Sequence, residues 1–382
     1  MKKIGLITFH ASHNNGSMLQ ALALQTVLEK KYNCKVEIIN FSNESQRNMY
    51  AVLPKADNYK RLIKNVIWMT KYKEMKKQYK SYCEFSGKYF HLSSKEYSLS
   101  SQLEELDGVY DAIIAGSDQV WNIACRDADD AYYLNFVQKT PKYAYAVSFG
   151  ANNPFELGER NKYINYINKF RMISVREKNA QKWIADATGV KPKICLDPTM
   201  LLNENQWTNI VSIGEEPVIS GEYIYYYCFS IDSKIKKFLR WISKIKKMPV
   251  YFMEAKEWTL KMCWKENIHL IGKYGPDVYM NVVKNSSLFI TTSFHGTAFA
   301  TILKKNFWYI NDGKPNKKDD RAVSFLTQLG LMNRYRTIEE LKNVDLDVCP
   351  DYKEPYEKLK LLQEESFKYL DLLVKDCEKS EK

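Results

Sequence analysis

A histidine that follows an apolar run in the second half of the chain is the residue best placed for proton transfer. The run, 288–292, is rich in β-forming residues, and a helix-like pattern begins after the short polar turn that carries His295 and Gly296. A strand leading through a tight turn into a helix N-terminus presents backbone N–H groups and a positive dipole end, which favour a phosphate or a carboxylate. Histidine has a pKa suited to donating a proton near neutral pH. The segment therefore predicts a site for an anion that also receives a proton; the alternative is a histidine that serves only packing.

Other polar residues also come directly after predicted strands. An opening strand, helix and strand over residues 3–41 predicts a parallel, doubly wound α/β sheet. Such sheets bind ligands beyond the carboxyl ends of their strands. We therefore expect one cleft to receive the side chains that follow these strands, which are His10, Asp118, Arg176 and His295.

The chain is long enough for two domains. Its 382 residues exceed one comfortable core, and a second series of strands and helices begins after Gly221. We predict an N-terminal Rossmann-like domain over residues 1–200 and a C-terminal one over 201–350. The charged, amphipathic segment 351–382 is expected to form a helix or helix pair that crosses back onto the first domain.

Composition excludes several classes of protein. Eight cysteines without a CxxC pair argue against a zinc ribbon and a disulfide framework, and reduced cytosolic thiols are the simpler interpretation. No run approaches 18 apolar residues, so no membrane-spanning segment is expected and a cytoplasmic location is predicted. No dense cluster of His, Asp and Glu is seen, so we expect no catalytic metal.

Much of the net charge of +12 is concentrated in the segment 54–80. It contains nine Lys or Arg residues and two acidic residues, and its apolar residues recur at helical spacing. The segment predicts a basic amphipathic helix. Either the helix packs its apolar stripe on the domain and leaves the lysines in solvent, or it rests on anionic lipid headgroups, and both interpretations are compatible.

Several motifs, taken in order, resemble the polysaccharide pyruvyl transferase family. The resemblance runs from residue 4 to about residue 330, nearly the whole chain. It rests on Asn14–Ser17, Leu19–Ala21, Ala23–Gln25, Ala115–Asn122, Ile173–Lys178, Leu196–Thr199 and Ser293–Phe299. The resemblance implies a fold similar to that of GT-B glycosyltransferases, with two Rossmann-like halves around a cleft.

The resemblance also implies a reaction. Members of the family transfer the pyruvyl group of phosphoenolpyruvate onto two hydroxyls of a sugar and form a cyclic pyruvate ketal, with release of phosphate. No separate cofactor is implied, because phosphoenolpyruvate is the donor substrate. The expected acceptor is a hexose or amino-hexose of a bacterial capsule, exopolysaccharide or other surface polysaccharide, or of its lipid-diphosphate-linked precursor. The segment 54–80 would then help to hold the enzyme at the inner face of the membrane.

The second domain is expected to bind the donor. The resemblance assigns the phosphoenolpyruvate contact to Arg176, whose guanidinium is a two-pronged donor; the alternative is an ion pair with Glu177 or a helix carboxylate. It makes His295 the proton donor to the enol carbon or to the leaving phosphate. Arg321, after the charged residues 317–320, is either a second phosphate contact or part of a solvated lid. The expected anion cradle consists of Ser293, His295, Gly296 and Thr297.

The first domain is expected to bind the acceptor sugar. Asp118 is predicted to accept a proton from a sugar hydroxyl, although it could also cap the following turn. Trp121 is available as an aromatic platform, although a tryptophan is more often buried in the core. The full set predicted on this side is His10, Asn15, Gly16, Gln20, Asp118 and Trp121.

Two other functions compete with this prediction. A GT-B glycosyltransferase would share the cleft but would need a pocket for a nucleotide sugar, and Glu254 and Asp277 are weak candidates for binding its ribose. A nucleic-acid-binding protein would use the basic segment 54–80, but no RNP, helix-turn-helix or zinc pattern accompanies that charge. We therefore do not expect nucleic acid as a partner, and the sequence leaves the oligomeric state open.

Overall fold

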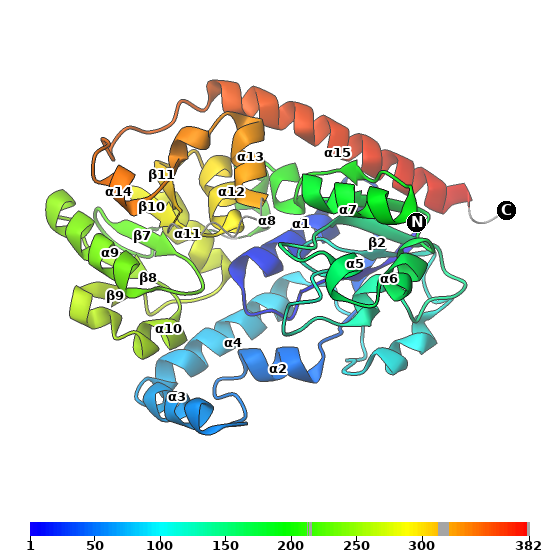
Figure 1. The fold of residues 1–382 in the computed structure, drawn as a ribbon, viewed down its shortest axis with the longest axis horizontal. Helices are drawn as coiled ribbons and strands as arrows, with labels where there is room; N and C mark the ends of the chain where they lie inside the picture. Colours follow the sequence, from blue (N-terminus) through cyan, green and yellow to red (C-terminus); the bar gives the residue numbers. More distant parts are fainter. Residues whose placement is uncertain (212, 214–215, 312–320, 380–382) are drawn as a thin grey trace.

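The computed structural model of the protein consists of two halves, each built around a parallel six-stranded sheet (Figure 1). It describes residues 1–211, 213, 216–311 and 321–379. The residues 317–320, which were considered above as part of a lid, lie outside this description. The predicted doubly wound α/β class is confirmed by the two parallel sheets and the helices that separate their strands.

The first sheet has the strand order β2-β1-β3-β4-β5-β6. Ile4 and Leu6 on β1 belong to the core on one face of this sheet, and Ile7 belongs to the core on the other face. The strands of this sheet are β1 (Lys3–Ile7), β2 (Lys35–Ile38), β3 (Ala112–Ala115), β4 (Lys142–Val147), β5 (Met172–Val175) and β6 (Lys193–Ile194). The helices of this half are α1 (Asn15–Lys30), α2 (Glu44–Tyr50), α3 (Tyr59–Met69), α4 (Tyr72–Tyr89), α5 (Pro154–Leu157), α6 (Arg160–Ile167) and α7 (Lys178–Thr188).

The second sheet has the strand order β12-β11-β10-β7-β8-β9, with β10 next to β7 and β11. Its strands are β7 (Ile224–Tyr227), β8 (Val250–Phe252), β9 (Ile268–Leu270), β10 (Leu288–Thr291), β11 (Phe307–Ile310) and β12 (Tyr335–Arg336). The helices that follow the first half are α8 (Glu204–Ile210), α9 (Ser233–Lys246), α10 (Ala255–Leu260), α11 (Pro276–Asn285), α12 (Phe294–Ile302), α13 (Arg321–Leu329), α14 (Ile338–Leu341) and α15 (Lys353–Lys379).

The long helix α15 lies across both halves (Figure 1). The Gln363 amide donates to Met200 O at 2.6 Å, and the Tyr369 hydroxyl donates to Ala144 O on β4 at 2.9 Å. At its far end, Asp376 accepts a hydrogen bond of 2.7 Å from Tyr143. Near the start of α15, the Tyr356 hydroxyl donates to Ile302 O on α12 at 2.7 Å, so this helix joins the first sheet to the second half. None of the helices in the described part of the chain combines the length and the apolar character needed to cross a bilayer.

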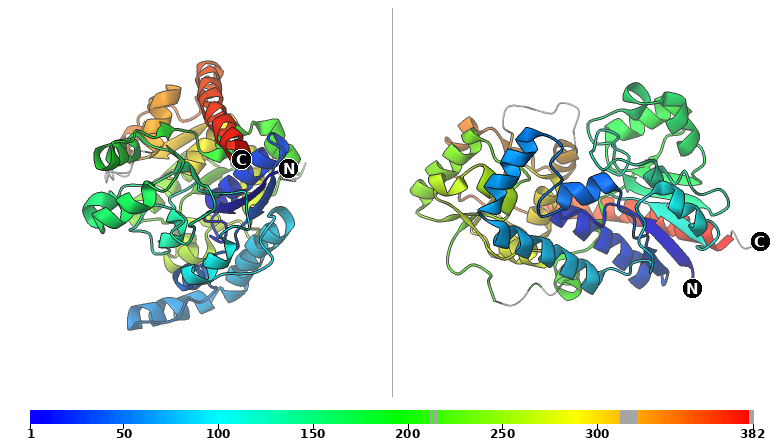
Figure 2. Two further views of the ribbon diagram at one scale, coloured as in Figure 1. Left: turned by 90° about the vertical axis from the view of Figure 1, so that its right-hand side faces the viewer. Right: turned by 90° about the horizontal axis from the view of Figure 1, so that it is seen from below.

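The prediction of one helix over residues 54–80 is wrong. Residues 54–58 are not helical, and α3 and α4 are separate helices that are interrupted at Thr70 and Lys71. Asn58 determines the late start, because its side chain accepts a hydrogen bond of 2.9 Å from the backbone N–H of Arg61 and so caps α3. Figure 2 shows the two helices at the margin of the molecule, with α4 lying closer to the body than α3.

Candidate active site

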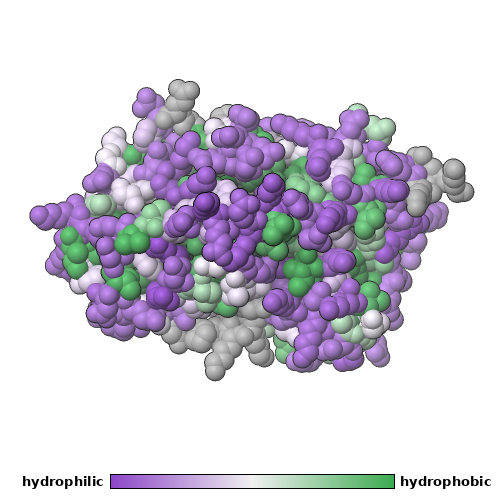
Figure 3. All heavy atoms as spheres, turned by 90° about the horizontal axis from the view of Figure 1, so that it is seen from above, coloured by the Kyte–Doolittle hydropathy of each residue, from purple (hydrophilic) through white to green (hydrophobic). Residues whose placement is uncertain are grey.

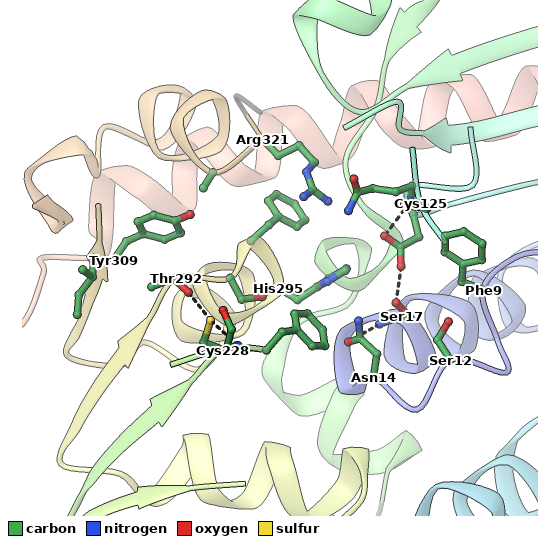
Figure 4. Close-up of a pocket in the computed structure, with 18 of the residues that line it drawn as sticks. Phe9, Ser12, Asn14, Ser17, Cys125, Cys228, Thr292, His295, Tyr309 and Arg321 are labelled. Atoms are coloured by element: carbon green, nitrogen blue, oxygen red, sulfur yellow. Dashed lines mark hydrogen bonds between the residues drawn. The ribbon is translucent and has the colours of Figure 1, made fainter. Parts of the chain in front are cut away.

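A cavity of about 540 Å³ lies between the two halves (Figure 4). The first half contributes residues from the loop after β1, from α2 and from the loop after β3. The second half contributes the turns after β7 and β10, the end of β11 and the start of α13. The cavity therefore lies at the carboxyl ends of the strands of both sheets, where parallel sheets bind ligands.

The turn between β10 and α12 is the segment in which the sequence predicts the donor site. The Ser293 side chain caps α12 by accepting from the backbone N–H of Gly296 at 3.4 Å, and the hydroxyl of Thr291 accepts from the Ser293 N–H at 2.9 Å. The first N–H groups of a helix lack intrahelical partners, and here they belong to Phe294 and His295, both of which line the cavity. The start of α12 can therefore receive an anion.

The predicted cradle needs a correction at two positions. The Gly296 N–H is engaged by Ser293, and the Thr297 N–H donates to the Ser293 carbonyl at 3.0 Å. Gly296 is small for a packing reason, because a Cβ on it would lie 2.2 Å from Oγ1 of Thr291 on β10. Ser293 and His295 line the cavity, whereas Gly296 and Thr297 do not.

His295 belongs to a buried cluster of charges centred on Asp197. The Asp197 carboxylate lies 2.5 Å from Nη2 of Arg176 and 3.3 Å from Nε2 of His295, and it also accepts a hydrogen bond from the Thr199 hydroxyl. Burial would raise the pKa of Asp197, but the charges of Arg176 and His295 outweigh burial and hold it far below its usual range. Asp197 is therefore ionised, and its carboxylate holds Arg176 and His295 together in the interior.

Arg176 lies behind the wall of the main cavity. It is 6% exposed, its guanidinium stacks 5.1 Å from the Phe294 ring, and its Nη2 donates to the Ser117 hydroxyl at 2.7 Å. The carboxylate with which it pairs is Asp197, not Glu177. Arg176 lines only a small cavity of about 40 Å³ on the far side of Phe294, so its predicted contact with the donor stays a prediction.

Asp118 faces the cluster from the first half. It accepts hydrogen bonds from the Ser17 hydroxyl at 2.5 Å and from the backbone N–H of Gln119 at 2.8 Å, and it lies 3.9 Å from Nη1 of Arg176. Burial would raise the pKa of Asp118, but His295 and Arg176, together with the Ser17 hydroxyl, lower it. An ionised Asp118 from the first half therefore lines the same cavity as His295 from the second half.

Gly16 and His295 bring the two halves into contact. A Cβ on Gly16 would lie 2.2 Å from Nδ1 of His295, a distance that real Cβ atoms do not reach. Gly16 was predicted to contact the acceptor, but it is buried in the first turn of α1 and does not line the cavity. Its role in the structure is to let the imidazole approach α1.

Four of the predicted acceptor residues have side chains that are engaged inside the protein. Asn15 accepts from Tyr82 at 2.9 Å, and Gln20 donates to Thr8 at 2.8 Å and accepts from the Ser117 N–H. Trp121 is fully buried and stacks on Tyr133, so it is a core residue and cannot be an aromatic platform for a sugar. His10 is likewise buried, contacts Thr8 O and Asn40, and has a pKa lowered by burial. None of His10, Asn15, Gln20 and Trp121 lines the cavity.

Arg321 reaches across the cavity from the start of α13 (Figure 4). The Gln119 amide is oriented with its oxygen toward Arg321. This oxygen accepts hydrogen bonds from Nη1 and Nη2 of the Arg321 guanidinium at 3.0 and 3.1 Å. The guanidinium also lies 6.0 Å from the Phe294 ring. The predicted cation therefore lies in the cavity, on the same side as His295.

The structure adds residues that the sequence did not indicate. Asp127, in the loop after β3, lines the cavity and accepts from the Gln46 amide at 3.1 Å; burial raises its pKa, in contrast to Asp118. No motif indicated it, because its neighbours in sequence form neither a strand nor a helix. Several aromatic and polar residues of the second half share the cavity: Phe229, Ser230, Asp232, Tyr309, Asn311 and Tyr335.

A metal cluster is not found in the described part of the chain, since no three His, Cys, Asp or Glu side chains converge there.

Comparisons with known proteins agree with this architecture. A family model described as polysaccharide pyruvyl transferase matches residues 14–313. None of the curated proteins matches this sequence. Among solved structures, a UDP-N-acetylglucosamine 2-epimerase superposes with a TM-score of 0.51 at 11% identity, over 98% of this chain and 95% of that chain. The UDP-GlcNAc 2-epimerase from Methanocaldococcus jannaschii gives a TM-score of 0.50 at 12% identity, over 96% and 99% of the two chains. The enzyme of the same name from Neisseria meningitidis, bound to UDP-GlcNAc, gives a TM-score of 0.50 at 12% identity, over 98% and 100%.

At such low identity these likenesses show the fold alone. The two parallel sheets around a cleft have the GT-B architecture, so the predicted GT-B-like fold class is confirmed.

Proposed function

Because the chain belongs to the polysaccharide pyruvyl transferase family, we propose that it transfers the pyruvyl group of phosphoenolpyruvate to two hydroxyls of a hexose or amino-hexose. The product would be a pyruvate ketal on a bacterial surface polysaccharide or its lipid-linked precursor. The observation that carries this proposal is the meeting of His295, Arg321 and the N-terminus of α12 at one end of the cavity, with the ionised Asp118 opposite.

The donor is proposed to bind against the second half. Phosphoenolpyruvate carries a carboxylate and a phosphate, and the cavity offers the Arg321 guanidinium and the first N–H groups of α12 for these anions. Arg176 lies behind Phe294, but its charge is balanced by that of Asp197, which leaves Arg321 and the start of α12 as the groups that face the donor's negative charges. The charges on the wall therefore match those of the donor.

His295 is proposed to protonate C3 of the enol. Protonation makes C2 cation-like, and the oxygen of the first sugar hydroxyl then bonds to C2. Cleavage of the bond from C2 to the phosphate oxygen releases phosphate, and the second hydroxyl closes the ring. The two hydroxyls lose two protons; one replaces the proton given to C3 and the other leaves with phosphate. Asp197, whose carboxylate lies 3.3 Å from Nε2 of His295, holds the imidazole in place for this sequence.

The carboxylates of the first half are proposed to handle the hydroxyl protons. Asp118 has a lowered pKa and is a weak base, so it is better suited to orienting a hydroxyl and stabilising the cation-like C2. Asp127 has a raised pKa and is the better proton acceptor at neutral pH. Both carboxylates line the cavity and belong to the first half of the molecule.

A thermal-shift titration tests donor binding. Phosphoenolpyruvate is compared with UDP- and GDP-sugars on the wild type and on Arg321→Ala, with Arg240→Ala, an exposed arginine on α9, as the matched control. A ligand at 100 times its Kd stabilises a protein by about 2.7 kcal/mol. We expect phosphoenolpyruvate to shift the wild type and Arg240→Ala but not Arg321→Ala. A shift produced only by a nucleotide sugar would overturn the proposal in favour of a glycosyltransferase.

Turnover is tested by phosphate release from phosphoenolpyruvate in the presence of candidate acceptor sugars, with mass spectrometry of the product. The expected product gains one pyruvyl group with loss of water. Phosphate release without such a product would mean that the donor is hydrolysed and not transferred.

A further inference from the structure

The helix α3 exposes the apolar face that amphipathic helices of globular proteins normally bury. Its apolar residues recur at positions i, i+3, i+4, i+7 and i+10, which lie on one side of a helix. These side chains are more than half exposed: Tyr59 70%, Leu62 56%, Ile63 55%, Val66 59% and Met69 61%. We call these five residues the α3 stripe. The interpretation in which this stretch packs its apolar stripe on the domain is therefore wrong for α3.

The opposite side of α3 holds the helix to the second half. Trp68 is 6% exposed, its Nε1 donates to Lys256 O at 3.0 Å, and the Lys256 ammonium lies 5.4 Å from the centre of its ring. Asn65 donates to Pro54 O at 2.8 Å. These contacts fix the rotation of α3 about its axis, so the α3 stripe is held outward by the fold.

The charged residues of α3 itself are all positive. Lys60, Arg61 and Lys64 lie on α3, which contains no acidic residue, and none of the three pairs with a carboxylate in the described part of the chain. Lys71 and Lys73 continue the positive charge at the start of α4. An apolar stripe flanked by lysine and arginine is the pattern of a helix that lies in the interface of an anionic bilayer.

The position of α3 sets it apart from the rest of the surface. It lies at the lower margin of the molecule in Figure 1. On the opposite, upper face, apolar residues are scattered among hydrophilic ones (Figure 3). The helix that precedes it, α2, contributes Met49 and Tyr50 to the wall of the cavity. The α3 stripe therefore lies a short loop away from the proposed active site.

We propose that the α3 stripe and its flanking cations dock the protein on an anionic phospholipid surface. The apolar side chains enter the boundary between headgroups and acyl chains, while the lysines and the arginine contact the headgroups. Docking through α3 brings α2 and the cavity near the surface, which suits an acceptor carried on a lipid. This last benefit rests on the proposed function, whereas the docking itself rests on the geometry of α3.

The test is co-sedimentation of the full chain with vesicles. Vesicles of phosphatidylcholine with phosphatidylglycerol are compared with phosphatidylcholine alone, using the wild type and a variant with Leu62→Ser, Ile63→Ser and Val66→Ser. The matched control carries Leu361→Ser and Leu372→Ser, which replace exposed leucines of α15 that are 62% and 58% exposed. We expect the wild type and the control to bind the anionic vesicles, and the α3 variant to bind at least about tenfold more weakly.

A second variant keeps the test independent of the apolar substitutions. Lys60→Gln, Arg61→Gln and Lys64→Gln remove three charges, each of which contributes about fivefold to binding near an anionic surface. Binding is expected to fall in this variant and, for the wild type, with added salt. Circular dichroism of each variant checks that the fold is kept.

Three results would overturn the proposal. They are failure of the wild type to bind anionic vesicles, equal binding by the α3 variant, and a wild-type dimer that the same serine substitutions dissociate in the absence of vesicle binding. The last result would assign the α3 stripe to a second copy of the chain. The thermal shift with phosphoenolpyruvate is measured on the same proteins, so a failure of docking is distinguished from a failure of the proposed reaction.

Discussion

Two helices, α1 and α12, begin at the cleft from opposite halves and meet at their first turns. Both start with a side-chain cap, since Asn14 accepts from the Gly16 N–H at 2.9 Å and Ser293 accepts from the Gly296 N–H. Both are buried along most of their length. They differ in what their first turns do with their polar groups.

The polar residues of α1 are used inside the protein. Asn15 bonds to Tyr82, Ser17 to Asp118, and Gln20 to Thr8 and the loop after β3. On α12, the side chain of His295 and the first N–H groups face the cavity. The comparison indicates that α1 is a frame that holds the loop after β3 in place, whereas α12 supplies the groups that we propose to bind the donor.

The largest expected effect is that of His295→Ala, which removes the reacting group from α12. General acid catalysis contributes about 10²- to 10⁴-fold, so we expect kcat to fall by roughly a thousandfold in the phosphate-release assay. His269→Ala, which removes an exposed histidine next to Tyr251, is the control and should keep full activity. Near-normal turnover by His295→Ala would mean that α12, like α1, supplies no reacting group.

The next effect concerns the carboxylate that holds α12 to the first half. Asp197→Asn keeps the shape of the side chain but removes the carboxylate nearest to the buried Arg176, and the loss of one partner of a buried ion pair typically costs about 3–5 kcal/mol. We expect a lower free energy of unfolding in denaturant titrations at pH 7.

The pH dependence of that loss follows from the lowered pKa of Asp197. A depressed folded pKa contributes stability that is fully present above the unfolded value of about 3.9 and is lost as the pH falls towards the folded value. The difference between wild type and Asp197→Asn should therefore be largest near neutral pH and shrink below about pH 4. A difference that stays constant in acid would mean that Asp197 stabilises the protein by packing alone.

A smaller loss is expected from Gly16→Ala, which changes only the frame. The added Cβ cannot remain 2.2 Å from the imidazole, so His295 must shift. A displacement of about 1 Å at a reacting group can cost on the order of 100-fold in rate. The control is Gly87→Ala on α4, where a Cβ meets no atom within 4 Å and full activity is expected. Unchanged kcat in Gly16→Ala would show that His295 is not positioned by α1.

Local structure around the site could be predicted from the sequence. The apolar run before residue 293 and the polar turn after it predict β10 and α12, and the similar pattern at the start of the chain predicts β1 and α1. Periodicity decides these elements because it reflects contacts between near neighbours in sequence. The doubly wound class was predicted from the alternation of strands and helices along the chain.

The sequence could not tell which of the predicted polar residues face the cavity and which are engaged inside the protein. The contact of Gly16 with His295 and the burial of Trp121 depend on how distant segments pack against each other. The spacing of residues within one segment does not predict this packing. The same limit applies to α3 and α9, which are both basic and amphipathic. On α9 the apolar residues Phe238 and Leu239 are buried, whereas the α3 stripe is exposed.

The smallest effect is expected from Ser17→Ala, which tests whether the frame also tunes the chemistry. The Ser17 hydroxyl donates to the Asp118 carboxylate at 2.5 Å and helps to lower its pKa, so its removal should raise that pKa. If ionised Asp118 is needed for turnover, the acid limb of the profile of kcat/KM against pH moves to higher pH by up to about one unit, with little change at the plateau. Ser81→Ala on α4, whose hydroxyl donates only to Lys77 O, should leave the profile in place. A limb that does not move in Ser17→Ala would assign the titration to another group, with Asp127 as the next candidate because burial raises its pKa. A moved limb would mean that α1 contributes to the reaction through a carboxylate that it does not itself carry.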